Sequence, residues 1–218
     1  MMVKNVIVKS KSKVRVRSEK ELKVRKNEFL KICNLLDLLN IDYFINTGIL
    51  LGAVRHNDFI PWDWDVELSV YSENVINKFD ILVKRITESG FKIEKYYKEQ
   101  SRLKIDFFGK LPSDVNAYTI QGWKHDKKKK IFWRTSFKIP DHFIINAKKI
   151  KLFNKYHFAP YPVEDYLEYK YGNWRKPIKT SNKFVYMRKE FSGMNITNHY
   201  IKKTGNLIKK FIFLFFKK

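Results

Sequence analysis

The sequence predicts a single α+β domain in which helices flank a mixed β-sheet. Segments with apolar residues at helical spacing are interspersed with short segments that alternate apolar and polar residues, as half-buried strands do. The 218 residues, 44% of them hydrophobic, are enough to bury one core. We find no internal repeat and no low-complexity linker in the sequence, so one domain is the economical interpretation.

The first predicted helix begins at Ser18, because Ser18 and Glu21 have the spacing of a capping box. Apolar residues recur at helical spacing over residues 22–39, and Asn40 is the expected stop. Cys33 lies on this apolar face, so we expect a core residue and not a nucleophile. As the single cysteine, it also excludes an internal disulfide and a cysteine-based zinc cluster.

The next predicted elements are a short buried strand at residues 43–45 and a glycine-punctuated turn at 48–55. A second strand, introduced by a proline, is expected at 62–70. Ser72 is expected to cap a helix that ends at Gly90 and carries a clean apolar stripe.

Four more segments complete the expected fold. Period-2 alternation predicts strands at residues 91–97 and 102–108. One or two further strands are expected within 115–139, around a basic run at 125–130 that is typical of a solvated hairpin tip. A proline opens and a glycine closes a short helix predicted at 163–171.

The charge balance favours anionic partners. The chain has 45 Lys and Arg against 22 Asp and Glu, a formal net charge of +23. Such a surface attracts polyanions, anionic lipid surfaces and phosphorylated substrates, and does not choose among them. Lysine-rich coding bias would also raise the count.

Residues 1–17 form a basic N-terminal segment, residues 18–180 the expected domain, and residues 181–218 a basic extension with an apolar tail. Residues 1–17 hold no continuous apolar stretch of the secretory type, and the simplest setting is cytoplasmic. The tail at 207–218 is shorter than the ~20 residues that cross a bilayer as a helix. It suits a peripheral foot at the inner face of the membrane, or a last element packed on the domain.

Three acids dominate the second predicted strand. Side chains alternate along a strand, so Asp63, Asp65 and Glu67 share one face, opposite an apolar face that includes Trp64 and Val66. Carboxylates aligned in this way repel one another unless a cation lies among them. Oxygen ligands on a strand favour Mg²⁺ or Mn²⁺, which also bind substrate phosphates. An ordinary acidic solvent face is the alternative.

A later strand carries a fourth acid. Arg102, Lys104 and Asp106 alternate with apolar residues and so share one face. If this strand lies beside the first acidic strand, Asp106 can complete a metal site while Arg102 and Lys104 reach phosphate oxygens. We therefore expect the two strands to be neighbours.

The segments at 48–56 and 59–67 together closely resemble the signature of the LicD family, which includes phosphocholine transferases of LicD type, fukutin and fukutin-related protein. The run Tyr166–Trp174 is similar to the family's Tyr-Gly-x-Trp motif, and the resemblance covers roughly residues 25–178. It implies a nucleotidyltransferase-like mixed sheet and the transfer of phosphocholine or a polyol phosphate from a CDP-activated alcohol to a sugar hydroxyl.

By this resemblance, Asp65 and Glu67 match the paired metal carboxylates, Asp63 the preceding acid, and Asp106 the third metal acid. The expected cofactor is Mg²⁺ or Mn²⁺. The sequence departs from the pattern at Glu67, where aspartate is usual, and at position 49, where an isoleucine replaces a serine or threonine.

Other polar and aromatic residues are expected to bind the substrate. Thr47 or Asn46 could replace the missing hydroxyl, and the Gly48 backbone N–H remains available beside it. Arg55, on the turn after Gly52, is suited to grip phosphate.

His56 is expected to orient this loop, and Trp62 could stack on a base or sugar, while Trp64 is expected in the core. Either Asp63 or Asp106 would take the proton from the acceptor hydroxyl.

The sequence thus predicts an enzyme that modifies a cell-surface glycan or its precursor, such as a capsule or lipopolysaccharide. A CDP-activated donor and a glycan acceptor are the expected partners, an anionic membrane surface is a further one, and no specific nucleic acid is expected. Two alternatives stay open: a nucleotidyltransferase acting on RNA or a small acceptor, and a non-catalytic module that binds polyanions or membranes.

Overall fold

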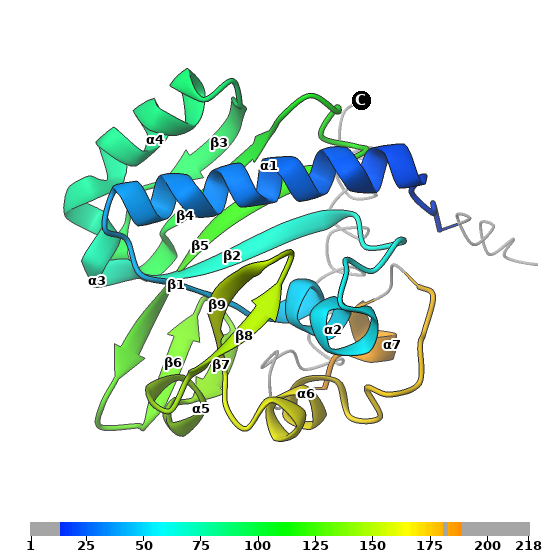
Figure 1. Cartoon of the computed structure of the whole chain (residues 1–218). Helices are drawn as coiled ribbons and strands as arrows, with labels where there is room; N and C mark the ends of the chain where they lie inside the picture. The colour runs from blue at the N-terminus through cyan, green and yellow to red at the C-terminus, as the bar shows by residue number, and fades with distance from the viewer. Residues whose placement is uncertain (1–13, 181–182, 189–218) are drawn as a thin grey trace, which may run out of the picture.

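The computed structural model describes residues 14–180 and 183–188 (Figure 1). A nine-stranded sheet forms its centre, in the order β3-β4-β5-β2-β1-β9-β8, with β6 paired to β5 and β7 to β6. The β2–β5 and β1–β9 pairs are parallel and the other pairs antiparallel. The strands are β1 (Tyr43–Ile45), β2 (Asp65–Tyr71), β3 (Lys92–Tyr97), β4 (Lys104–Phe108), β5 (Ala117–Asp126), β6 (Ile131–Arg134), β7 (Phe137–Pro140), β8 (Lys148–Leu152) and β9 (Lys155–Ala159).

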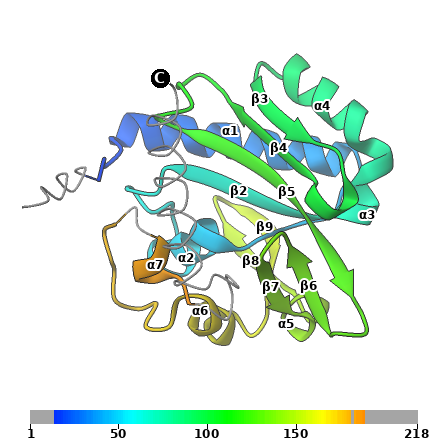
Figure 2. The ribbon, with the colours of Figure 1, turned by 180° about the vertical axis from the view of Figure 1, so that it is seen from behind.

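Two helices, α1 (Glu19–Leu38) and α4 (Phe79–Glu88), cover one face of the sheet. Figure 2, from behind, shows the strands β4 and β5 in front of α1. Apolar side chains of α1 such as Phe29 join those of β2 and β4 in one buried core. The predicted α+β class, with a mixed sheet and flanking helices, is confirmed.

The first helix forms as the sequence predicts. The Ser18 side chain accepts a hydrogen bond from the Glu21 backbone, and the Glu21 side chain accepts one from the Ser18 backbone. Asn40 follows the helix at φ 50°, in the left-handed region that a helix stop uses. Cys33 is buried, as predicted.

Two predicted boundaries around the acidic strand are wrong. The segment expected to be a turn, residues 48–55, belongs to a helix, α2 (Thr47–His56), because its apolar residues pack in the core and stabilise the helical conformation. Strand β2 begins at Asp65 and not at residue 62, so Asp63 lies in the turn before it. Trp64 is 52% exposed and is not a core residue.

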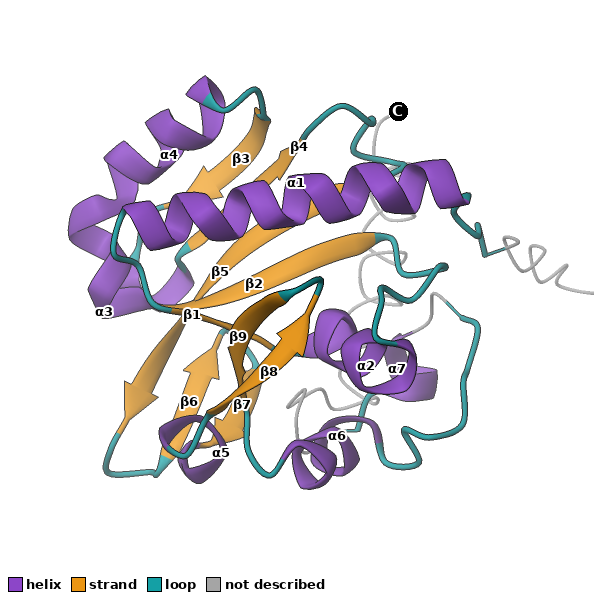
Figure 3. Cartoon of the chain, in the orientation of Figure 1, coloured by secondary structure: helices purple, strands orange, loops and turns teal. Residues whose placement is uncertain are grey.

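The other differences concern the residues at which helices and strands begin (Figure 3). Ser72 is the first residue of α3 (Ser72–Val75) and not a cap, and a 3-10 turn at Ile76–Lys78 separates α3 from α4. Arg102 lies in a 3-10 turn (Gln100–Arg102) before β4. The hairpin tip at 125–130 is confirmed as the β5–β6 turn.

Helix α6 (Val163–Tyr171) also forms as predicted. Four elements were not predicted, namely α5 (Asp141–Ile145), β8, β9 and α7 (Lys183–Tyr186). The last described helix is α7, and the predicted tail at 207–218 lies outside the described residues.

None of the helices that the structure describes combines the length and apolar composition needed to span a bilayer.

Candidate active site

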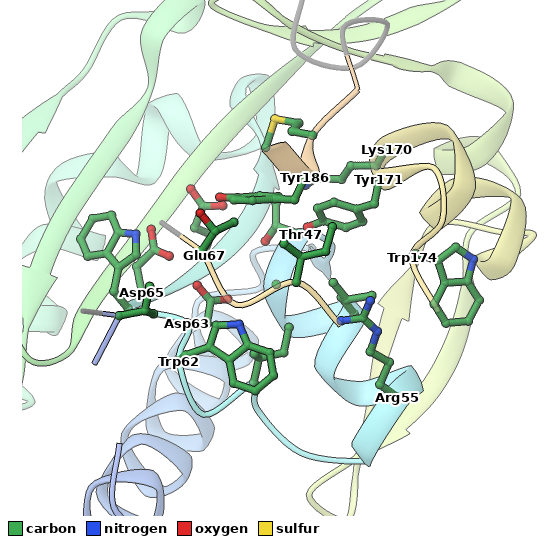
Figure 4. A pocket seen from close by; sticks show the side chains of 18 of the residues that line it. Thr47, Arg55, Trp62, Asp63, Asp65, Glu67, Lys170, Tyr171, Trp174 and Tyr186 are labelled. Carbon is green, nitrogen blue, oxygen red and sulfur yellow. The ribbon is translucent and has the colours of Figure 1, made fainter. Parts of the chain in front are cut away.

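A cavity of about 310 Å³ opens on the face of the sheet opposite α1. Helix α2, the turn before β2, the start of β2 and the chain around α6 and α7 form its walls (Figure 4). Most of the predicted site residues meet here: Thr47, Gly48, Arg55, Trp62, Asp63, Asp65 and Glu67 all line the cavity. Tyr171, Trp174, Tyr186 and Met187 close it from the other side.

The paired carboxylates have the geometry that strand alternation predicts. Asp65 and Glu67 are half-buried on one face of β2, whereas Val66 and Leu68 are buried on the other face, under α1. Figure 4 shows both acids at the cavity, with Asp63 beside them. Three acids therefore reach one cavity even though Asp63 comes from the turn and not from the strand.

Asp63 is positioned by close packing against α2. A Cβ added to Gly48 would lie 1.8 Å from Asp63 Oδ2, so only a glycine lets the carboxyl approach the helix this closely. The Asp63 backbone N–H donates to the Ile60 carbonyl at 3.0 Å, which closes the turn. Asp63 thus lies against the first turn of α2.

Two buried arginines bind the backbone at this turn and in the segment before β5. Arg25 of α1, which is 1% exposed, donates from Nη1 to the Asp63 carbonyl at 2.7 Å and from Nε to Asn116 Oδ1 at 2.6 Å. Arg17 donates from Nε to the Val115 carbonyl at 2.9 Å. Sequence reasoning did not find Arg25, although its place one turn before Phe29 on the apolar stripe was a signal.

Burial and charge set the ionisation of the cavity. Burial raises the pKa of Asp63 to about 6, the charge of Arg25 lowers it and the charge of Glu67 raises it further. Burial also raises the pKa of Tyr171 and of Tyr186, and the negative charges of Asp63 and Glu67 add to both shifts. The acids therefore form one concentrated region of negative charge.

The first turn of α2 contributes backbone and hydroxyl groups. Thr47 lines the cavity at φ 56°, and Asn46 makes no side-chain cap to the helix. Asn46 instead accepts a hydrogen bond from Ser69 Oγ at 3.1 Å. Ile49, where the resemblance expected a hydroxyl, is 2% exposed and packs in the core.

Three residues of the second half of α2 that were predicted to bind substrate have different surroundings. Arg55 lines the cavity and donates from Nη2 to the Lys176 carbonyl at 3.2 Å. His56 is exposed and is not among the lining residues described. Gly52 packs against the following loop, since a Cβ there would lie 2.4 Å from the Asp58 carbonyl oxygen.

Asp106 lies apart from the other acids, because β4 is not the neighbour of β2. Strand β5 lies between them, and the register Glu67↔Thr119↔Asp106 puts Asp106 two strands from Glu67. Lys104 pairs with Asp106 at 2.8 Å, and Thr119 Oγ1 donates to it at 2.7 Å. The predicted neighbour relation is wrong, since β5 returns parallel to β2 and occupies that place.

The residues present fit a divalent cation through a pair of acids and not through a larger cluster. Within the described ranges, no three His, Cys, Asp or Glu side chains are grouped closely enough to hold a metal ion together. Mg²⁺, however, is commonly bound by one or two carboxylates together with substrate phosphates and water. Asp65 and Glu67 provide such a pair at the wall of the cavity.

Comparison with known proteins identifies the family of this chain. The model of the family described as LicD/FKTN/FKRP, nucleotidyltransferase domain, matches residues 40–163. The human ribitol 5-phosphate transferase FKRP is 29% identical over 149 residues, which are 65% of this chain and 30% of that protein. The human ribitol-5-phosphate transferase FKTN is 24% identical over 152 residues, 66% of this chain and 32% of that protein.

This chain therefore spans about a third of the length of these relatives. An uncharacterized protein of Rickettsia prowazekii is 29% identical over 130 residues, 57% of this chain and 43% of its own length. Among solved structures, the antibiotic-resistance factor ANT(2'')-Ia superposes with a TM-score of 0.44 and 9% identity, over 64% of this chain and 66% of that one.

Proposed function

The chain is a member of the LicD/FKTN/FKRP family of nucleotidyltransferase domains, and we propose that it transfers a phosphorylated alcohol from a CDP-activated donor to a hydroxyl group of a glycan. One observation carries this proposal: Asp65 and Glu67 share a cavity with the first turn of α2. The names of the human relatives, both ribitol phosphate transferases, support a polyol phosphate as the group transferred.

The two sides of the cavity suit the two parts of an activated donor. Thr47 and Gly48 belong to the first turn of α2, where backbone N–H groups and the helix dipole favour phosphate. Arg55, at the other end of the helix, adds a guanidinium. Trp62 and Tyr186 supply aromatic faces for a base or sugar.

Asp65 and Glu67 would hold Mg²⁺ or Mn²⁺. The ion, when bound, supplies positive charge that neutralises the donor diphosphate and the leaving nucleotide. Of the two acids considered as the base, Asp63 lines the cavity and Asp106 is ion-paired two strands away. This supports assigning to Asp63 the acceptance of the proton from the attacking hydroxyl.

The test is release of CMP from CDP-choline, CDP-glycerol and CDP-ribitol with Mg²⁺ and glycan acceptors. Asp65→Ala should reduce turnover by at least about 10³-fold, because it removes half of the charge that holds the cation. The matched control is Asp80→Ala, which removes an acid with 80% side-chain exposure and should leave the rate of CMP release unchanged.

Equal turnover by wild type and Asp65→Ala would contradict the assignment. If the wild type released no CMP with any donor, the proposed activity would be wrong. Mg²⁺-dependent nucleotide incorporation into RNA would favour a nucleotidyltransferase that acts on RNA. Binding to polyanions or vesicles without turnover would favour a non-catalytic module.

A further inference from the structure

A second cavity, of about 220 Å³, lies on the sheet face that carries Glu67. In the register Lys95↔Asp106↔Thr119↔Glu67, partners lie directly opposite and place their side chains on one face. Lys95 and Lys104, from β3 and β4, line this cavity, so it shares the face of the active site. Strand β4, which carries Lys104, lies two strand spacings, roughly 10 Å, from β2, which carries Glu67.

Positive charge dominates the second cavity. Lys95, Arg102, Lys104 and Arg134 line it, and its lining within the described residues includes no acid. Asp106, next to the cavity, pairs with Lys104 at 2.8 Å and more loosely with Lys95 at 3.8 Å. Asp106 therefore offsets part of the charge of the two lysines, and the lining itself keeps an excess of positive charge.

Two of the cations are fixed by aromatic rings. The Arg134 guanidinium lies over Trp123 at 5.6 Å and over Phe137 at 5.1 Å, and Arg102 lies over Tyr97 at 3.9 Å. Stacking on a ring orients a guanidinium and leaves its edge N–H groups able to donate. The arginines are thus held ready for a ligand.

Arg134 also carries a buried donor that needs an acceptor. Its Nε is inaccessible to solvent and has no hydrogen-bond partner among the described residues. Burial lowers the pKa of Arg134, against the opposing effect of Glu67, Asp106 and Asp65. A desolvated cation with an unsatisfied N–H costs free energy, which an anionic ligand would offset.

We propose that this cavity binds a phosphate group on the acceptor, and so selects a phosphorylated glycan or polyol. Guanidinium groups match the oxygens of phosphate, and several cations favour a dianion over a singly charged carboxylate. The offset from Glu67 leaves room for the body of an acceptor whose hydroxyl reaches the carboxylates. The acceptor part of this inference rests on the proposed function, whereas the phosphate site does not.

Binding can be measured without catalysis, by calorimetric titration with glucose 6-phosphate at constant ionic strength and saturating CMP. Lys95→Ala/Arg102→Ala should raise Kd by about tenfold or more, since it removes two charge-assisted partners. Lys84→Ala/Arg85→Ala is the matched control, because it removes the same residue types from exposed positions on α4. The double variant spares Arg134, whose loss could unfold the hairpin, and Arg134→Lys provides a second probe.

Glucose should not bind measurably, glucuronate should bind more weakly than the phosphate, and inorganic phosphate should compete. Glucose 6-phosphate binding that is equal in the double variant and the control would overturn the inference, as would competition with CMP for one site. Tighter binding of inorganic phosphate than of the sugar phosphate would overturn the acceptor assignment. If phosphate binds as expected but no donor releases CMP, the proposed function fails and the phosphate site stands.

Discussion

The position of Asp63 depends on the absence of a side chain at Gly48. Gly48 allows the Asp63 carboxyl to lie against the first turn of α2, where an added Cβ would come within 1.8 Å of Oδ2. The carboxyl is thereby buried, and burial raises its pKa to about 6, while the charge of Arg25 lowers this pKa and the charge of Glu67 raises it. A single glycine thus fixes both the place and the ionisation of the acid that we assign as the base.

Gly48→Ala tests this relation. We expect the Asp63 carboxyl to move by about 1 Å or more and CMP release to fall by roughly 100-fold, because misplacement of this size disturbs a reacting group. Circular dichroism should show unchanged helix content, since alanine favours helices. Val54→Ile, which adds one methyl group at an exposed position of α2, is the control, and equal activity of both variants would refute the argument.

At the level of elements, α1 supports both the core and the active site. Its apolar stripe buries Phe29 and its neighbours against the sheet, while Arg25 and Glu28 on the same helix bind loop backbone. Glu28 accepts hydrogen bonds from the Lys110 backbone at 2.7 Å and from the Tyr118 hydroxyl at 2.7 Å. The helix therefore fixes the turn before β2 from behind.

Arg25→Met should show this coupling. The change leaves the Asn116 side chain and the Asp63 carbonyl without their donors, so the free energy of unfolding should fall by about 2–4 kcal/mol. Urea denaturation measures the loss, and CMP release at low denaturant should fall as well because Asp63 is no longer held. Lys23→Met, at an exposed position of the same helix, should leave both unchanged. A stable and fully active Arg25→Met protein would contradict the coupling.

Elements were predictable where a local pattern decides them. The capping box located α1, and period-2 alternation correctly assigned Asp65 and Glu67 to one face. Alternation fixes the face of a strand but not its neighbours, so the insertion of β5 between β4 and β2 could not be read from the sequence.

The missed β8–β9 hairpin lacked its usual signal. Its two-residue turn has Phe153 and Asn154 at φ 53° and 61°, whereas such turns favour glycine. The helical form of α2 was also hidden locally, because glycines recur in its sequence and only packing on the sheet decides between helix and turn.

At the scale of the whole molecule, the net charge of +23 sets the long-range behaviour. Such a charge speeds the arrival of anionic ligands and favours anionic surfaces, and both effects weaken as salt rises. The overall charge therefore acts in the same direction as the basic phosphate cavity, whereas the acids of the active-site cavity oppose an anionic donor until they hold a cation.

Deletion of residues 207–218 tests whether membrane binding depends on this tail or on the overall positive charge. We expect the full chain to sediment with anionic phosphatidylglycerol vesicles at 0.15 M salt. The shortened chain should bind these vesicles at least about tenfold more weakly. The reason is that the deletion removes both apolar side chains and lysines. Neutral phosphatidylcholine vesicles are the control, and undiminished binding of the shortened chain would assign the effect to the remaining charge.

Strands that bury one face and place charged side chains on the other also constrain where the length of this domain can change. In β4, Ile105 and Phe107 face the core, while Lys104 lines the phosphate cavity and pairs with Asp106 on the same face. Deleting one residue there would exchange the two sets, so that charges enter the core and apolar groups enter the phosphate cavity. We therefore expect these strands to tolerate substitutions, and insertions or deletions to be tolerated only in exposed connections such as residues 127–130, where the phase of the strands is not altered.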